Sequence, residues 1–139
     1  MRDSGKQVRG KLKRERPKLP KVSEEMKAWS AALSAEVAGW PEIRTRTFFG
    51  FNALYRGEQI FAVLPRTRAM GTPDSIAFKF ESPRARVRKL LETDPRIGST
   101  EMQAARWYTF ELSEDAHLRD ALEWLGRAYE AAGKRKSRA

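Results

Sequence analysis

Residues 43–64 read IRTRTFFGFNALYRGEQIFAVL, and this stretch decides the fold. Its first seven residues alternate between two kinds of side chain, which is typical of a β-strand with one buried face. Gly50 then indicates a turn or a bulge. Arg56-Gly57-Glu58 predicts a tight hairpin turn centred on glycine. The predicted strands of this stretch are 43–49, 51–55 and 59–64.

Helical patterns flank these strands. Ser23 is a plausible N-cap for a helix, and apolar residues recur after it at steps of three and four, at Met26, Trp29, Leu33 and Val37. The later elements are a strand at 75–80, a helix opened by Ser82-Pro83, a strand at 106–112, and a helix capped by Ser113 and ended by Gly133. The order α-β-β-β-β-α-β-α predicts a single α+β domain, an antiparallel sheet with helices packed on one face.

The positive charge of the chain is concentrated at its two ends. The protein has 139 residues and a formal net charge of +10. Residues 1–21 hold nine basic and two acidic side chains, and residues 133–139 hold four basic ones. Because the first segment has few apolar side chains, we expect a disordered basic arm at 1–21. A globular domain at 22–132 and a basic tail at 133–139 complete the predicted organisation.

A second concentration of positive charge lies inside the globular segment. Residues 44–89 contain ten basic and three acidic side chains. Basic side chains that neutralise phosphates release condensed counterions, so both regions are predicted to contact nucleic acid, with DNA as the expected partner and little sequence preference. The candidate nucleic-acid-binding residues are Arg9, Lys11, Lys13, Arg14, Arg16, Lys18, Arg66, Arg68, Arg84, Arg86, Arg88, Lys89, Lys134, Arg135 and Lys136.

The aromatic residues of the strands are predicted to form the core, with one exception. Phe48 is expected on the face of its strand opposite Thr47, beside Arg46, where an exposed ring can stack on an unpaired base. The aromatic residues predicted to be core are Phe49, Phe51, Phe61, Phe78, Phe80, Trp107 and Phe110.

Catalytic signals are weak in this sequence. The chain has no cysteine and a single histidine, His117, which we interpret as a solvated helix residue. No phosphate-binding loop, dinucleotide fingerprint or serine elbow is present in the sequence. We therefore expect no enzymatic activity, no cofactor and no metal. The absence of cysteine fits a reducing cytosol, so we expect a cytoplasmic protein. Because no apolar run approaches about 20 residues, we expect no membrane contact.

Short strand segments carry a family pattern: Phe48-Phe49-Gly50-Phe51, Leu54-Tyr55-Arg56-Gly57, Ile60-Phe61-Ala62-Val63-Leu64, Phe78-Lys79-Phe80 and Trp107-Tyr108-Thr109-Phe110. This pattern, over residues 26–132, is similar to the TfoX N-terminal domain and to the small YjbR-like proteins, and less closely to an uncharacterised luciferase-domain family. The resemblance implies an α+β fold, DNA binding and a regulatory role of the kind that TfoX-like proteins have in natural competence. It supplies no catalytic motif.

These observations lead to one preferred hypothesis and two alternatives. The preferred one is a non-catalytic protein whose arms, together with the 83–93 helix and Arg66 and Arg68, hold the phosphate backbone. The first alternative is a protein-interaction or regulatory module whose tails only improve solubility. The second is a small-molecule or enzymatic role in a pocket between the sheet and the helices. The sequence leaves open the choice between DNA and RNA, the biological process and the oligomeric state.

Overall fold

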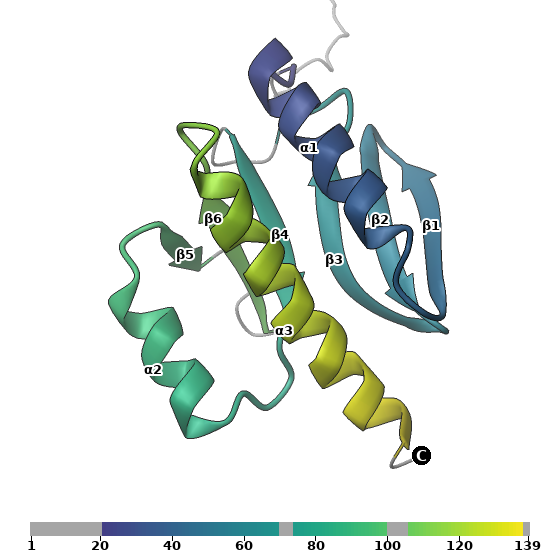
Figure 1. The fold of residues 1–139 in the computed structure, drawn as a ribbon, viewed down its shortest axis with the longest axis vertical. Helices are drawn as coiled ribbons and strands as arrows, with labels where there is room; N and C mark the ends of the chain where they lie inside the picture. Colours follow the sequence, from purple (N-terminus) through teal and green to yellow (C-terminus); the bar gives the residue numbers. More distant parts are fainter. Residues whose placement is uncertain (1–20, 70–73, 100–105, 138–139) are drawn as a thin grey trace, which may run out of the picture.

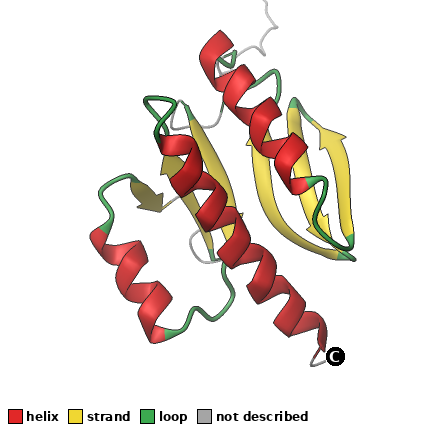
Figure 2. Ribbon diagram, viewed as in Figure 1, coloured by secondary structure: helices red, strands yellow, loops and turns green. Residues whose placement is uncertain are grey.

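The computed structural model describes residues 21–69, 74–99 and 106–137 of the chain. In these ranges three helices and six strands form one α+β domain (Figures 1 and 2). The predicted fold class is confirmed, with one strand more than the sequence pattern indicated. Among the described helices, none combines the length and the apolar composition needed to cross a bilayer.

Helix α1 (Glu24–Val37) begins where the capping pattern predicts. The Ser23 hydroxyl accepts a hydrogen bond from the Met26 amide at 3.0 Å, which satisfies one of the free donors at the helix start. Glu24 and Glu25 place negative charge in the first turn, where it interacts favourably with the helix dipole. The predicted apolar stripe is confirmed, and all four of its residues are buried: Met26, Trp29, Leu33 and Val37.

The six strands form a single antiparallel sheet in the order β1-β2-β3-β4-β6-β5. Five of them match predicted strands to within one residue at either end. The sequence prediction lacks β5, because three residues are too few to show an alternating pattern. The strands are β1 (Ile43–Phe48), β2 (Phe51–Arg56), β3 (Gln59–Pro65), β4 (Ser75–Lys79), β5 (Ile97–Ser99) and β6 (Trp107–Glu111).

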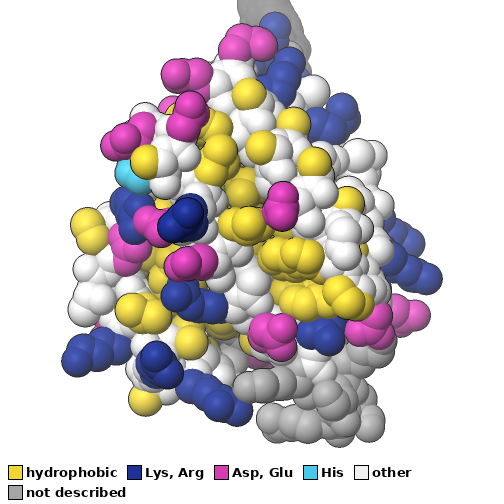
Figure 3. Space-filling view, in the orientation of Figure 1, with side chains coloured by type: hydrophobic (Ala, Val, Ile, Leu, Met, Phe, Trp, Pro, Cys, Tyr) yellow, Lys and Arg dark blue, Asp and Glu magenta, His cyan; other side chains and the backbone are white. Residues whose placement is uncertain are grey.

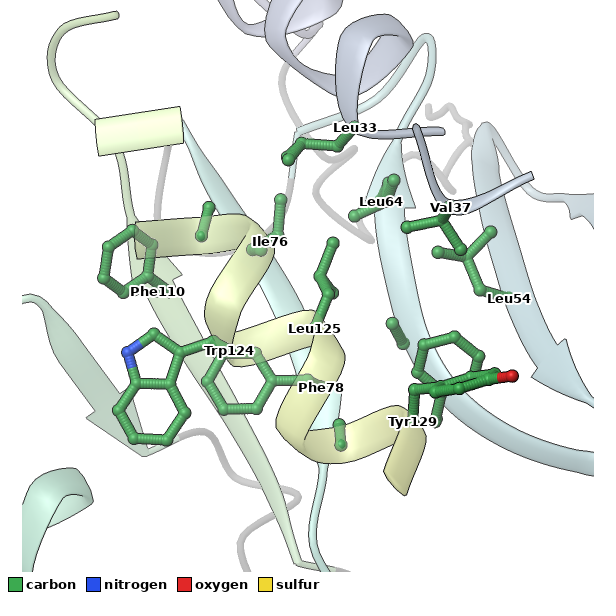
Figure 4. Packing of buried hydrophobic residues seen from close by; sticks show 14 of the residues in the cluster. Leu33, Val37, Leu54, Leu64, Ile76, Phe78, Phe110, Trp124, Leu125 and Tyr129 are labelled. Atoms are coloured by element: carbon green, nitrogen blue, oxygen red, sulfur yellow. The ribbon is translucent and has the colours of Figure 1, made fainter. Parts of the chain in front are cut away.

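The hydrophobic core lies between one face of the sheet and the helices. Helix α1 and helix α3 (His117–Ser137) lie across this face, while α2 (Ala85–Thr93) stands beside β5 (Figure 1). Phe78 of β4 stacks on Trp124 of α3 with ring centroids 5.4 Å apart, and Tyr129 packs edge-on against Phe61 of β3 (Figure 4). Burying each of the larger apolar side chains contributes about 1.5–3 kcal/mol.

Helix α2 differs from its predicted form at its start and on its face. Arg84, with φ −65° and ψ 160°, occupies the N-cap position in place of Ser82, and no side chain caps the helix. The sequence pattern predicts an apolar stripe of Val87, Leu90 and Leu91 on this helix. Leu91 is buried in the core cluster, whereas Leu90 is 38% exposed. The helix is therefore held by a narrower apolar contact than the sequence indicated.

Helix α3 begins at His117, three residues later than a cap at Ser113 predicts. The Ser113 amide donates to Nδ1 of His117 at 3.0 Å, and the Leu118 amide donates to the carbonyl of Asp115. The Asp115 carboxylate also accepts a hydrogen bond from the Trp29 indole at 2.7 Å. These bonds hold residues 113–116 in a turn that precedes the helix.

The prediction that α3 ends at Gly133 is wrong, since the helix continues to Ser137. The Arg56 guanidinium lies 4.2 Å from the centre of the Tyr129 ring and occupies the space where a Cβ at position 133 would be. The glycine therefore permits a close approach inside the helix, and it does not mark a helix end.

The face of the sheet opposite the core is called the open face from here on. Core contacts of α1, α2 and α3 all lie on the other face, so none of the described helices covers it. Strand register places Arg44, Arg46 and Phe48 of β1 on the open face, opposite Tyr55, Ala53 and Phe51 of β2. Some residues on the open face are nevertheless buried and lie outside the main core cluster, among them Ala53, Ala77 and Trp107.

Candidate nucleic-acid interface

A two-residue turn, Phe49-Gly50, connects β1 to β2, whose last paired residues are Phe48 and Phe51. Both turn residues have positive φ, +48° at Phe49 and +85° at Gly50. This pattern is that of a type I′ hairpin turn, which favours Asn, Asp or Gly at its first central position. A bulky side chain at positive φ is strained, so Phe49 occupies a position that its own backbone preference disfavours.

The turn presents its aromatic side chains to solvent. Phe49 is 87% exposed and Phe48 is 42% exposed. The Phe48 ring meets the Phe49 ring edge-on at 5.6 Å and lies 6.4 Å from the half-buried Phe51 ring. We call Phe48, Phe49 and Phe51 the phenylalanine tip.

Two aromatic residues predicted to be core, Phe49 and Phe51, are thereby corrected. Phe49 is exposed because the strand ends one residue earlier than the alternation suggested. A Phe-Gly pair in a two-residue loop is the signal that could have shown this. Phe51 is half-buried on the open face, outside the core cluster formed with the helices. Trp107 is buried as predicted, although it lies on the open face and outside that cluster. The prediction that Phe48 stands beside Arg46 on the opposite face from Thr47 is confirmed.

The loop after β3 is bonded to this turn. The Gly50 carbonyl accepts hydrogen bonds from the amides of Arg66, Thr67 and Arg68, at 3.0, 2.9 and 3.2 Å. The side chains of Thr67 and Arg68 fill the space where a Cβ of Gly50 would stand. We call residues 66–68 the basic loop; its position relative to the phenylalanine tip is set by these backbone bonds.

The amino-terminal segment joins the domain at the same place. Lys21 forms an isolated antiparallel bridge with Arg68, and the Val22 amide donates to the Thr67 carbonyl at 3.2 Å. The predicted basic arm is therefore attached to the domain next to the basic loop. The arm residues predicted to bind nucleic acid lie outside the described residues: Arg9, Lys11, Lys13, Arg14, Arg16 and Lys18.

Sequence reasoning did not select the two arginines of β1. Arg44 and Arg46 are exposed on the open face of this edge strand, and the Arg46 guanidinium lies 6.0 Å from the centre of the Tyr55 ring. Within the described ranges, Arg44, Arg46 and Arg66 have no carboxylate at ion-pair distance. The alternation of β1, which puts both β1 arginines on the face of Phe48, was the signal that could have found them.

Other basic side chains of the domain are engaged in its structure. Arg56 pairs with Glu42 at 3.2 Å and donates to the Tyr129 carbonyl at 3.1 Å. Arg96 binds two carboxylates, at 2.9 Å from Asp94 and 3.0 Å from Asp120. Its hydrogen bonds lower the pKa of Asp94 below the ordinary value of 3.8, against the opposing effect of burial.

The basic residues of α2 form a separate patch. Arg84, Arg86, Arg88 and Lys89 are exposed, and basic side chains surround the position of α2 at the lower left of Figure 3. The basic loop precedes β4 and α2 follows it, so the two lie at opposite ends of that strand. The structure therefore does not join α2 with Arg66 and Arg68 into one docking surface. Lys134, Arg135 and Lys136 belong to the last turns of α3, and their side chains lie outside the described part.

An open depression of about 550 Å³ lies at the far end of β1 from the phenylalanine tip. Its lining includes Glu42, Arg44 and Glu58. It is not the pocket that the second alternative places between sheet and helices, where the aromatic core residues pack against one another (Figure 4). In the parts of the chain that are described, no three His, Cys, Asp or Glu side chains come together as candidate metal ligands.

Comparison of the chain with family models, with curated proteins and with solved structures found no match. The resemblance to TfoX-like and YjbR-like domains therefore stays a prediction. The function has to be argued from the geometry of the described residues.

Proposed function

We propose that this protein is a non-catalytic nucleic-acid-binding protein of the TfoX-like and YjbR-like type. Its docking end is formed by the basic loop, the attachment point of the arm and the phenylalanine tip. The observation that carries the proposal is the backbone network that joins Gly50, residues 66–68 and Lys21. This network brings together two basic segments that are far apart in the sequence.

The electrostatic argument follows from this juxtaposition. Residues 1–21 contribute nine basic side chains, and they enter the domain beside Arg66 and Arg68. Acidic side chains gather around the amino-terminal ends of α1 and α3 (Figure 3), where Glu24, Glu25, Glu114 and Asp115 are exposed. A polyanion held at the basic loop is therefore directed away from these helix ends and toward the open face.

The expected binding is salt-dependent. It has little sequence preference, because phosphate contacts position a protein without identifying bases. If about five to eight phosphates are neutralised on duplex DNA, log K should fall against log[salt] with a slope of about −4 to −7. DNA is the partner we propose.

The test is a salt titration of labelled duplex DNA with the full chain and three full-length variants. Replacing the six arm residues Arg9, Lys11, Lys13, Arg14, Arg16 and Lys18 by Gln should make the slope shallower by as much as about five. Arg66→Gln should make it shallower by about one. Arg119→Gln, at an exposed position of α3, is the control and should leave it unchanged. Salt-insensitive binding that is equal for all four proteins would refute the proposal.

A protein-interaction role is the second candidate, because β1 is an edge strand. Its residues after Ile43 are exposed, and it pairs only with β2 in the described sheet. Such an edge can accept a strand from a partner. Capture of a defined partner from nuclease-treated lysate, with no oligonucleotide binding at physiological salt, would favour this role over nucleic-acid binding.

A further inference from the structure

We propose that the phenylalanine tip stacks on unpaired bases, so that this protein prefers single-stranded or locally opened nucleic acid to closed duplex. The inference rests on the proposed function, since the phosphate contacts bring the strand to this end of the domain. It adds the class of ligand, which charge alone does not select.

The first argument is that folding does not explain Phe49. Its side chain is 87% exposed, so it gains little from burial, and its φ of +48° lies in a region that Asn or Gly adopts with less strain. Its edge-on contact with Phe48 is a small compensation. Strained positions that the fold does not reward are found where a side chain acts on a ligand.

The second argument is the row of flat groups that continues from the tip. Phe48 and Phe51 face each other across β1 and β2 on the open face, followed by Arg46 and the Tyr55 ring. Aromatic rings and guanidinium planes are the surfaces on which proteins stack single-stranded bases. A closed duplex offers no free base faces along its length, so the row can be used only by unpaired nucleotides.

The third argument is that the row lies between cationic groups. Arg44 and Arg46 lie along β1, and Arg66 and Arg68 lie on the loop bonded to Gly50. A strand whose bases stack on the rings would carry its phosphates past these side chains. This combination of stacking platform and positive charge is what sequence-tolerant single-strand binding requires.

A lipid surface is the competing ligand, since exposed phenylalanines beside arginines also suit a membrane interface. Nucleic acid is favoured because the aromatic row extends along the sheet, away from the tip, and includes Tyr55 with Arg46 above it. Membrane anchoring would use the tip rings and leave this part of the open face without a role.

The experiment measures the affinity of the full chain for a labelled 20-nucleotide oligo(dT), for a 20-base-pair duplex and for phosphatidylserine vesicles. We expect tighter binding to oligo(dT). Phe49→Asn should weaken oligo(dT) binding about 5- to 100-fold and leave duplex binding unchanged. Phe49→Trp keeps a stacking ring and should retain the affinity. Leu90→Asn removes another exposed apolar side chain, on α2, and should change neither affinity.

The outcomes separate the inference from the proposed function. Equal affinity of the wild-type protein for both nucleic acids, unchanged by Phe49→Asn, would overturn the inference and leave nucleic-acid binding standing. Absence of binding to both would overturn both. Vesicle binding that Phe49→Asn abolishes, with oligo(dT) binding unaffected, would overturn the inference in favour of a membrane ligand. Phe49→Asn should fold, since Asn suits the positive φ, and a cooperative thermal transition verifies this.

Discussion

Two turns of two residues connect the first three strands: Phe49-Gly50 between β1 and β2, and Gly57-Glu58 between β2 and β3. In the second turn Gly57 takes the positive φ, at +61°, and exposed Glu58 follows it. That arrangement is a type II′ turn with the residue types that the type favours. In the first turn both residues have positive φ, and the first of them is a nearly fully exposed phenylalanine.

The difference shows how a fold can point to a functional residue without a catalytic motif. Gly57 is explained by its backbone, and Gly50 by its backbone together with the amides and side chains packed on it. Phe49 is explained by neither, because an Asn there would serve the turn better. A residue that makes its own turn less stable and buries little is the residue on which to base a functional hypothesis.

The largest expected effect comes from Gly50→Ala. The new Cβ would collide with the side chains of Thr67 and Arg68, at a residue whose φ is +85°. The Gly50 carbonyl would then no longer be aligned with the three basic-loop amides that donate to it. We expect a loss of about 2–4 kcal/mol in the free energy of unfolding. Gly57→Ala should cost only about 1 kcal/mol, from its positive φ. Urea unfolding of both variants measures the contrast, and equal losses would contradict the tighter packing inferred at Gly50.

Arg56→Gln should have the next largest effect on stability. It tests the contacts that anchor the second turn. The Arg56 guanidinium covers the Tyr129 ring, bonds the Tyr129 carbonyl and pairs with Glu42. We expect a loss of about 1–3 kcal/mol of stability. Arg44→Gln, one strand away and exposed, is the matched control and should change stability by less than about 0.5 kcal/mol. A loss in the control as large as in the variant would show that charge, and not packing, is responsible.

The contrast between the two turns also shows which features of the structure could be predicted from the sequence. The strands and α1 were predictable because their side chains alternate or recur at helical spacing, with caps such as Ser23 that act locally. Helix ends were less predictable, because tertiary contacts set them: Trp29 engages Asp115 before α3, and Arg56 packs on Gly133 within it. The hydrogen bonds of Gly50 join the first turn to the basic loop, which is distant in the sequence, so no sequence pattern predicts them.

Phe49→Asn tests the first turn in the stabilising direction. Asn tolerates positive φ, so relief of strain should outweigh the lost contact with Phe48 and raise the free energy of unfolding by about 0.5–1 kcal/mol. Glu58→Asn in the second turn should change it by less than about 0.5 kcal/mol, because that position is already unstrained. Thermal and urea unfolding measure both. A destabilised Phe49→Asn protein would mean that the ring supports the turn, and the functional interpretation of its exposure would lose its basis.

The smallest expected effect concerns the acid sensitivity of the domain, which we attribute to Asp94 and to neither turn. Hydrogen bonds from Arg96 lower the pKa of Asp94 in the folded protein. The ionised carboxylate therefore stabilises the fold at pH values above its ordinary pKa of 3.8. That stabilisation is lost as the pH falls through the lowered pKa, when the proton neutralises the acceptor. Stability measured between pH 6 and pH 2 should therefore fall less steeply for Asp94→Asn than for the wild-type protein. The stability of Phe49→Asn should fall with pH in parallel with that of the wild-type protein, since neither Phe nor Asn titrates. A steeper fall in Asp94→Asn would show that another carboxylate dominates the acid transition.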